Sequence, residues 1–184
     1  MKHALIIGEP HSGKTTLIHK ITQTLACTVT GFETKKENRF ANEANGSPIY
    51  IYRVGEPHGQ SEENLLGYSK MQHLSVDESA FDRAAQWVFA DDPTADLIVM
   101  DEIGVMESCS EAFCREIIRC LDGERPVLAA VKSKDSPFLS AVRAHPNCRC
   151  FYLTEENRDA IYPQVLAFVR EQFGQLSDIN SEDF

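Results

Sequence analysis

The feature that most constrains this chain is a run of eight residues near its start, Gly8-Glu9-Pro10-His11-Ser12-Gly13-Lys14-Thr15. The run follows a short apolar segment, residues 3–7, and precedes a segment in which Leu17, Ile21 and Leu25 fall on one helical face. It therefore predicts a turn between a buried strand and a helix, which is the repeating unit of a parallel sheet covered by helices.

The residue types in this run match the pattern G-x-x-x-x-G-K-T of a phosphate-binding loop. Glycine at both ends permits backbone torsions that turn successive amide hydrogens toward an anion, and the helix that follows directs its positive end to the same point. Lys14 would contact the β- and γ-phosphates, Thr15 would offer its hydroxyl to Mg²⁺, and Thr16 would bind the α-phosphate. The sequence thus predicts a site for a nucleoside triphosphate, formed by Gly8, Glu9, Pro10, His11, Ser12, Gly13, Lys14, Thr15 and Thr16.

A second motif lies at Leu97-Ile98-Val99-Met100-Asp101-Glu102, an apolar strand that ends in two acids. This is the Walker B pattern, in which Asp101 would hold Mg²⁺ and Glu102 would orient or deprotonate an attacking water. Asp101-Glu102-Ile103-Gly104 also spells D-x-x-G, which GTPases use. A switch GTPase should also carry Asn-Lys-x-Asp, and Asn157-Arg158-Asp159 matches that pattern poorly.

Phosphoryl transfer also benefits from a second cation at the transition state, commonly an arginine. Arg158 follows the last expected strand, at the sheet edge where α/β folds bind ligands, and is a candidate nucleotide-binding residue. The sequence does not rank it above the other candidates, which are Arg39, Arg53, Arg83, Arg115 and Arg119.

Composition excludes some function classes. The 184-residue chain carries a formal net charge of −10, which disfavours a nucleic-acid binder because such proteins need a basic surface. No apolar run is long enough to span a membrane, and the start lacks a signal-peptide pattern. Six scattered cysteines fit reduced thiols better than a zinc site. We expect a cytoplasmic protein, with a monomer favoured over an oligomer.

Apolar strands alternating with amphipathic segments predict one α/β domain over residues 1–173, followed by an acidic tail at 174–184. Asn45-Gly46 is typical of a tight turn, and it predicts a β-hairpin insert near residues 33–55, with strands at 39–42 and 49–54. Two S-x-x-E patterns, at 75–78 and 108–111, predict helix starts.

At this point the chain resembles a known family, the small P-loop nucleoside-triphosphatases that include a cancer-related eukaryotic member. The matching segments follow one another in order: Gly8–Thr16, 31–34, 101–108, Phe113 and 157–159. The segment Asp101-Glu102-Ile103-Gly104-Val105-Met106-Glu107 is the most specific of them, and the resemblance covers residues 2–170. It implies a RecA-like parallel sheet and Mg²⁺-dependent hydrolysis of nucleoside triphosphates with broad base selectivity, using the loop, Asp101 and Glu102. Residues 33–73 depart from the family's pattern.

Two other classes of function remain open from the sequence. A kinase would use the same loop and strand, with residues 33–73 as a lid over an acceptor nucleotide or metabolite. A nucleotide-dependent binding module would turn over slowly until it met its partner. The acidic pair fits a hydrolase or a kinase, whereas no ligand cluster supports the module.

Overall fold

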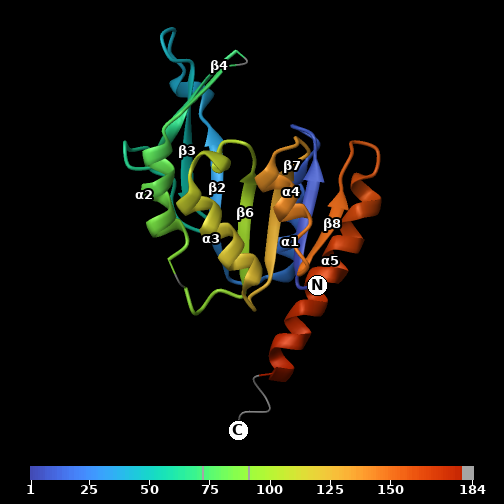
Figure 1. The fold of residues 1–184 in the computed structure, drawn as a ribbon. Coiled ribbons are helices and arrows are strands. Elements are labelled where there is room, and N and C mark those ends of the chain that lie inside the picture. Colours follow the sequence, from blue (N-terminus) through green and yellow to red (C-terminus); the bar gives the residue numbers. More distant parts are fainter. Residues whose placement is uncertain (72, 91, 180–184) are drawn as a thin grey trace.

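The computed structural model describes residues 1–71, 73–90 and 92–179, which form one eight-stranded sheet with helices on both faces (Figure 1). The strands are β1 (His3–Gly8), β2 (Val29–Lys36), β3 (Ser47–Arg53), β4 (Leu65–Lys70), β5 (His73–Val76), β6 (Leu97–Ile103), β7 (Val127–Lys132) and β8 (Cys148–Tyr152). The helices are α1 (Lys14–Leu25), α2 (Glu78–Val88), α3 (Glu111–Asp122), α4 (Pro137–Arg143) and α5 (Arg158–Ile179). No helix in the described ranges is long and apolar enough to cross a membrane.

The sheet has the strand order β5-β4-β3-β2-β6-β7-β1-β8. The five strands from β2 to β8 in this order are parallel, whereas β3, β4 and β5 are antiparallel. The predicted fold class, a parallel sheet flanked by helices, is confirmed for those five strands. One strand, β7, separates the strand before the loop from the strand that carries the acidic pair, so both end at the same edge.

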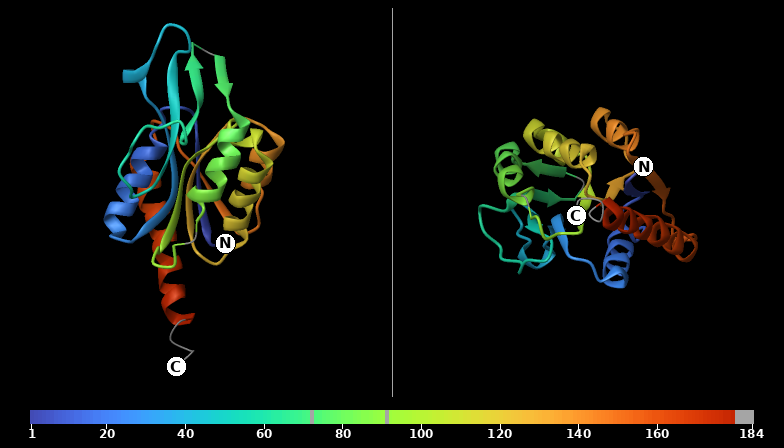
Figure 2. Two further views of the ribbon diagram at one scale, coloured as in Figure 1. Left: turned by 90° about the vertical axis from the view of Figure 1, so that its left-hand side faces the viewer. Right: turned by 90° about the horizontal axis from the view of Figure 1, so that it is seen from below.

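Helices α2, α3 and α4 cover one face of the sheet, and α1 and α5 cover the other (Figure 2). Every residue of β1 is buried because both faces of this strand are covered, which explains its uninterrupted apolar run. Beneath α2 and α3, the ring of Phe113 makes edge contacts with Phe32, Phe81 and Phe89 at centroid distances of 5.0–5.2 Å. Burial of this aromatic cluster fixes the two helices on β2.

The predicted hairpin insert exists, but its first strand is β2 itself. Strand β2 extends to Lys36, which pairs with Ile49 of β3, so the prediction of a strand at residues 39–42 is wrong. Asn38–Phe40 instead form a short 3-10 turn, and a bridge between Asn42 and Gly46 closes the end of the hairpin. A second hairpin, β4–β5, adds two strands that the sequence did not predict. Both hairpins rise beyond the carboxyl ends of the parallel strands (Figure 1).

The helix boundaries show which caps form. Asp77, not Ser75, caps α2 by accepting a hydrogen bond from Ser79 N, because Ser75 lies in β5. Ser110, not Ser108, caps α3 by accepting from Phe113 N. Helix α5 continues to Ile179, beyond residue 173, where the predicted domain ends. Residues 180–184 of the predicted tail lie outside the described residues, and the division into domain and tail stays a prediction.

Candidate active site

The loop between β1 and α1 folds tightly around its own backbone. Gly13 has a φ of 103°, in the left-handed region that favours glycine, and His11 also has a positive φ, 66°. A Cβ on Gly8 would lie 2.6 Å from Ser12 Oγ and 2.7 Å from the carbonyl oxygen of Leu153, so a larger residue does not fit there. Both glycines of the motif are therefore required by this loop conformation.

Lys14 lies inside the loop and is only 5% exposed. Its ammonium group donates hydrogen bonds of 2.8 Å to the carbonyl oxygens of Gly8 and Glu9. The same nitrogen lies 3.1 Å from Oε1 of Glu102, a contact that is an ion pair and not a directed hydrogen bond. The loop and the acidic pair therefore meet at Lys14, as the two motifs predict.

Asp101 and Thr15 form the second contact between the two motifs. Thr15 Oγ1 donates a hydrogen bond of 3.1 Å to Asp101 Oδ1, and Asp101 is 5% exposed. Burial is the largest cause that raises the pKa of this carboxyl, while the hydrogen bond from Thr15 opposes it. A buried carboxylate beside a hydroxyl is a donor set that suits a hard cation such as Mg²⁺.

The described ranges contain no cluster of three or more His, Cys, Asp or Glu side chains that could enclose a metal. Mg²⁺ usually takes one or two protein oxygens and fills its other positions with phosphate oxygens and water. Thr15 and Asp101 fit this arrangement, in which the bound nucleotide supplies the remaining ligands.

Arg158, predicted to bind the nucleotide, lies against the outside of the loop. Its Nε donates to the carbonyl oxygen of Ser12 at 2.6 Å and its Nη2 to that of His11 at 3.1 Å. These bonds connect the first residue of α5 to two carbonyl groups of the loop. The other candidates Arg39, Arg53 and Arg83 pair with the nearby acids Glu37, Glu56 and Asp77.

A pocket opens beside Arg158 between α1 and α5. The residues that line it include Gly13, Thr16, Lys20, Arg158 and Tyr162. The Lys20 ammonium lies 4.0 Å from the centre of the Tyr162 ring, and the Tyr162 hydroxyl lies 2.9 Å from Thr24 Oγ1. An aromatic ring next to the α-phosphate end of a loop is a suitable neighbour for a nucleobase.

Three other predicted loop residues, Glu9, Pro10 and Ser12, differ in burial. Glu9 and Pro10 lie at the surface, and Glu9 Oε1 accepts a hydrogen bond of 2.5 Å from Ser133 Oγ. Ser12 is buried, and its hydroxyl has no hydrogen-bond partner among the described residues.

Two charged residues at this edge were not singled out by sequence reasoning. Lys132, the last residue of β7, places its ammonium 3.9 Å from Oε2 of Glu102. Glu107 is 3% exposed and accepts a hydrogen bond of 2.7 Å from the backbone N of Gly104. Burial is the largest cause that raises the pKa of Glu107 to about 7. A lysine at the carboxyl end of an apolar strand was a usable signal for the first of them.

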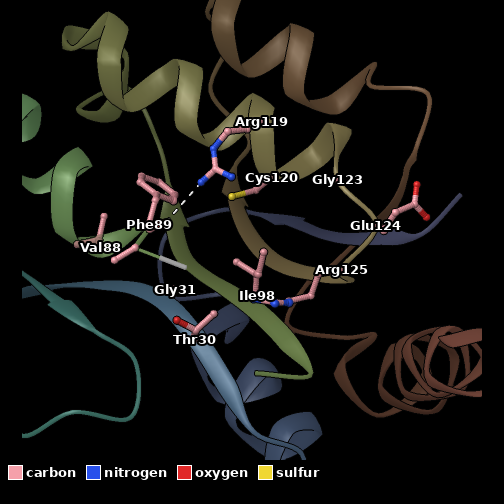
Figure 3. Close-up of a pocket in the computed structure, with 11 residues that line it drawn as sticks. Thr30, Gly31, Val88, Phe89, Ile98, Arg119, Cys120, Gly123, Glu124 and Arg125 are labelled. Atoms are coloured by element: carbon pink, nitrogen blue, oxygen red, sulfur yellow. Dashed lines mark hydrogen bonds between the residues drawn. The ribbon is translucent and has the colours of Figure 1, made fainter. Parts of the chain in front are cut away.

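A separate pocket lies at the opposite edge, near the amino ends of β2 and β6 (Figure 3). Its lining includes Thr30, Ile98 and Arg119, and the Arg119 guanidinium donates to the carbonyl oxygen of Phe89 at 3.4 Å. Ile98 lies near the amino end of β6 and Asp101 near its carboxyl end, so this pocket is separate from the phosphate-binding loop. Of the residues proposed from the sequence, the candidate arginine Arg119 lines this pocket, whereas the phosphate loop, Asp101, Glu102 and Arg158 do not.

Comparison with known proteins gives a consistent result along most of the chain. A family model described as NTPase matches residues 3–166. The nucleoside-triphosphatase THEP1 of Thermotoga maritima is 30% identical, over 93% of this chain and 97% of its own length. The cancer-related nucleoside-triphosphatase of Homo sapiens is 26% identical, over 92% of this chain and 97% of its own length.

Two solved structures share the fold. The crystal structure of THEP1 from the hyperthermophile Aquifex aeolicus aligns with a TM-score of 0.59 and 25% identity, covering 91% of this chain and 98% of that one. The solution structure of a human cancer-related nucleoside triphosphatase aligns with a TM-score of 0.65 and 24% identity, covering 93% and 98%. The similarity to the human structure shows that the two chains share a fold.

Proposed function

Because the chain belongs to the NTPase family and is an enzyme that hydrolyses nucleoside triphosphates, we propose that the reaction takes place between its loop and the carboxylates of Asp101 and Glu102. The family resemblance drawn from the sequence is thereby confirmed, and the relatives give no support to the kinase alternative. We propose ATP and GTP, with other nucleoside triphosphates, as substrates, and the diphosphate and phosphate as products.

The observation that carries the assignment of the site is the contact of 3.1 Å between Lys14 and Glu102. Lys14 is the residue that this motif directs to the β- and γ-phosphates, so its neighbour lies beside the reacting phosphorus. A bound γ-phosphate would compete with the Glu102 carboxylate for the same ammonium. Glu102 would then be free to accept a hydrogen bond from water on the far side of that phosphate.

In the proposed reaction the water oxygen attacks the γ-phosphorus while Glu102 accepts a proton from the water. The bond between the γ-phosphorus and the β-phosphate oxygen breaks, and the diphosphate leaves with that electron pair. Mg²⁺, held by Asp101 and Thr15, would supply positive charge to the β- and γ-phosphate oxygens. Loop amides and Lys14 hold the phosphates in position, so the protein contributes mostly orientation and electrostatic stabilisation.

We propose that the nucleobase lies in the pocket beside Tyr162, with Arg158 acting through the loop carbonyls and not on the phosphates. An aromatic wall binds any base through its π face, which fits broad base selectivity. All six cysteines lie within the described residues and are free, which fits a reducing compartment, and we place the enzyme in the cytoplasm. Neither nucleic acid nor membrane is a partner in this proposal, and a monomer is favoured.

The test is phosphate release from ATP, GTP, CTP and UTP with Mg²⁺, comparing the wild type with Glu102→Gln. We expect kcat to fall by about 10²-fold or more, since a positioned general base is lost. Nucleotide affinity should be retained or improved, because the neutral amide no longer competes for Lys14. Glu62→Gln, an exposed glutamate in the loop before β4, is the matched control and should hydrolyse normally.

Full activity in Glu102→Gln would exclude Glu102 as the group that activates water. Transfer of labelled γ-phosphate to an acceptor faster than to water would instead restore the kinase alternative. If activity persists in excess chelator, hydrolysis does not require Mg²⁺, and the role proposed for Asp101 is excluded.

A further inference from the structure

The carboxylate of Glu102 lies between two lysines that come from different strands. Lys14 Nζ is 3.1 Å from one carboxylate oxygen, and Lys132 Nζ is 3.9 Å from the other. The motif accounts for Lys14 but says nothing of Lys132. A second cation beside the reacting phosphate is the component that sequence reasoning sought among the arginines.

The position of Lys132 follows from the sheet. It is the last residue of β7, the strand between β1 and β6, and it pairs in register with Gly8, the first residue of the loop. Its side chain therefore starts beside the loop and ends beside Glu102. About one third of the side chain is exposed, so the ammonium is accessible to a ligand.

Gly104 allows the Lys132 side chain to take this path. A Cβ on Gly104 would lie 2.8 Å from Cδ and 3.3 Å from Cε of Lys132, so any larger residue would displace the lysine stem. The backbone N of Gly104 is held by Glu107, whose carboxylate also interacts electrostatically with Lys132. Gly104 and Glu107 thus lie beside the stem of Lys132, and its ammonium, like that of Lys14, lies near the Glu102 carboxylate.

We propose that Lys132 is a further catalytic residue, which binds a γ-phosphate oxygen opposite Lys14 and stabilises the negative charge of the transition state. The proposal rests on the proposed function, because it places the γ-phosphate where the Glu102 carboxylate meets both lysines. As water attacks and the bond to the β-phosphate oxygen breaks, charge is spread over the γ-phosphate oxygens and the leaving oxygen. Lys132 transfers no proton in this step, and its ammonium does what an arginine finger does in other phosphoryl-transfer enzymes.

The alternative is that Lys132 only holds Glu102 or Glu107 in place. The two roles differ in what the lysine recognises. A group that binds the γ-phosphate distinguishes a triphosphate from a diphosphate, and it favours a mimic of the transition state most. A group that only positions Glu102 has no effect once that carboxylate is gone.

The experiment compares Lys132→Ala and Lys132→Arg with Lys134→Ala, an exposed lysine two positions on that serves as control. Three readouts are used: kcat and KM for ATP, the affinity for ADP, and the affinity for ADP with fluoroaluminate and Mg²⁺. For Lys132→Ala we expect kcat to fall by about 10²-fold, as for loss of one preorganised charge stabiliser. Affinity for ADP should stay within about 2-fold of the wild type, while binding of the fluoroaluminate complex falls at least as much as kcat. Lys132→Arg should recover part of both losses.

The same binding measurements in a Glu102→Gln background separate this inference from the proposed function. Lys132→Ala should weaken the fluoroaluminate complex there too, because that complex needs no activated water. An effect that disappears in this background, or equal weakening of ADP and the fluoroaluminate complex, would overturn the proposal. Normal kcat in Lys132→Ala would also overturn it. If Lys132→Ala fails to fold, Lys132→Met, which keeps most of the lysine stem and lacks the charge, must show the same pattern.

Discussion

Two lysines show how the parallel and antiparallel parts of the sheet differ. Lys14 donates to the carbonyl oxygens of Gly8 and Glu9, and Lys70 donates to those of Glu43 and Ala44. The local bonding is the same, but Lys14 is buried beside a carboxylate and Lys70 is exposed at a hairpin end. The difference is that the fold places the Glu102 carboxylate of β6 beside Lys14, whereas the Lys70 ammonium donates to carbonyl oxygens of its neighbouring hairpin.

The wider contrast follows the strands. The carboxyl ends of β1, β6 and β7 supply the loop, the acidic pair and Lys132, and the turn after β8 leads to Arg158. In contrast, β3, β4 and β5 supply only one of the candidate residues, Arg53, whose guanidinium pairs with Glu56. Parallel strands end at one edge and so gather side chains from distant segments, whereas antiparallel strands distribute their ends over two edges. The antiparallel hairpins also leave Phe40, Met71 and Leu74 exposed at their ends.

The largest expected effect tests the two lysines directly. Lys14→Ala removes the cation of the loop, and we expect NTP hydrolysis to fall by about 10³-fold, the upper range for loss of one electrostatic stabiliser. Lys70→Ala, which loses an equivalent pair of hydrogen bonds, should retain normal kcat and KM. Phosphate release measured for both variants checks the contrast. Comparable losses in the two variants would show that the antiparallel part takes part in catalysis.

An intermediate effect is expected from Glu107, under the parallel edge. Because burial raises its pKa to about 7, the folded protein binds this proton more tightly than the unfolded chain does. The free energy of unfolding should therefore decline as pH rises from about 4.5 to about 7, by about 3 kcal/mol from this group. Glu107→Gln remains neutral and should lack this decline.

Denaturant unfolding of the wild type and Glu107→Gln at pH 5 and pH 8 measures this decline in the free energy of unfolding. The difference between the two proteins is the quantity of interest, because His3, whose pKa burial lowers to about 4, has an opposing pH dependence in both. Glu62→Gln supplies a control from an exposed loop. Identical pH profiles for Glu107→Gln and the wild type would contradict the assignment.

The smallest effect is expected at the end of the β4–β5 hairpin. Met71 is 91% exposed and has a φ of 53°, a conformation that asparagine tolerates better than most residues. Met71→Asn should change the free energy of unfolding by no more than about 0.5 kcal/mol. The rate of hydrolysis should be unchanged. Denaturant unfolding measures the first quantity and phosphate release the second. A drop in kcat would show that the β4–β5 hairpin contributes to catalysis, and would contradict the difference drawn between the parallel and antiparallel parts of the sheet.

The sequence predicts the parallel part better than the antiparallel part for a physical reason. Strands buried on both faces appear as short apolar runs, and the motifs at the ends of β1 and β6 predict where those strands stop. The segment at residues 39–42 had the flanking turn of a strand, but β2 already occupied the pairing position beside β3. Pairing between segments is not encoded in local pattern, and a cap such as Ser110 depends on where the preceding turn ends.

The site was predictable only in part for the same reason. Lys14, Asp101 and Glu102 belong to contiguous motifs, and their roles stay predictions until the variants are measured. Lys132 ends an apolar strand and Glu107 ends the segment 101–107, but strand order and burial, which local pattern does not report, bring them to the site. Arg158 was selected from its place after the last strand, but its contact with loop carbonyls required the three-dimensional structure.

The loop depends on parts of the chain that are made last. Strand β1 pairs with β7 and β8, and the bond from Arg158 to Ser12 joins residues 146 positions apart. A ribosome releases the loop first and its supports only near the end of translation. During most of synthesis the eight motif residues are therefore an unsupported amino-terminal segment. A chain that stops before Arg158 carries the complete motif but lacks the contacts that hold the loop in shape.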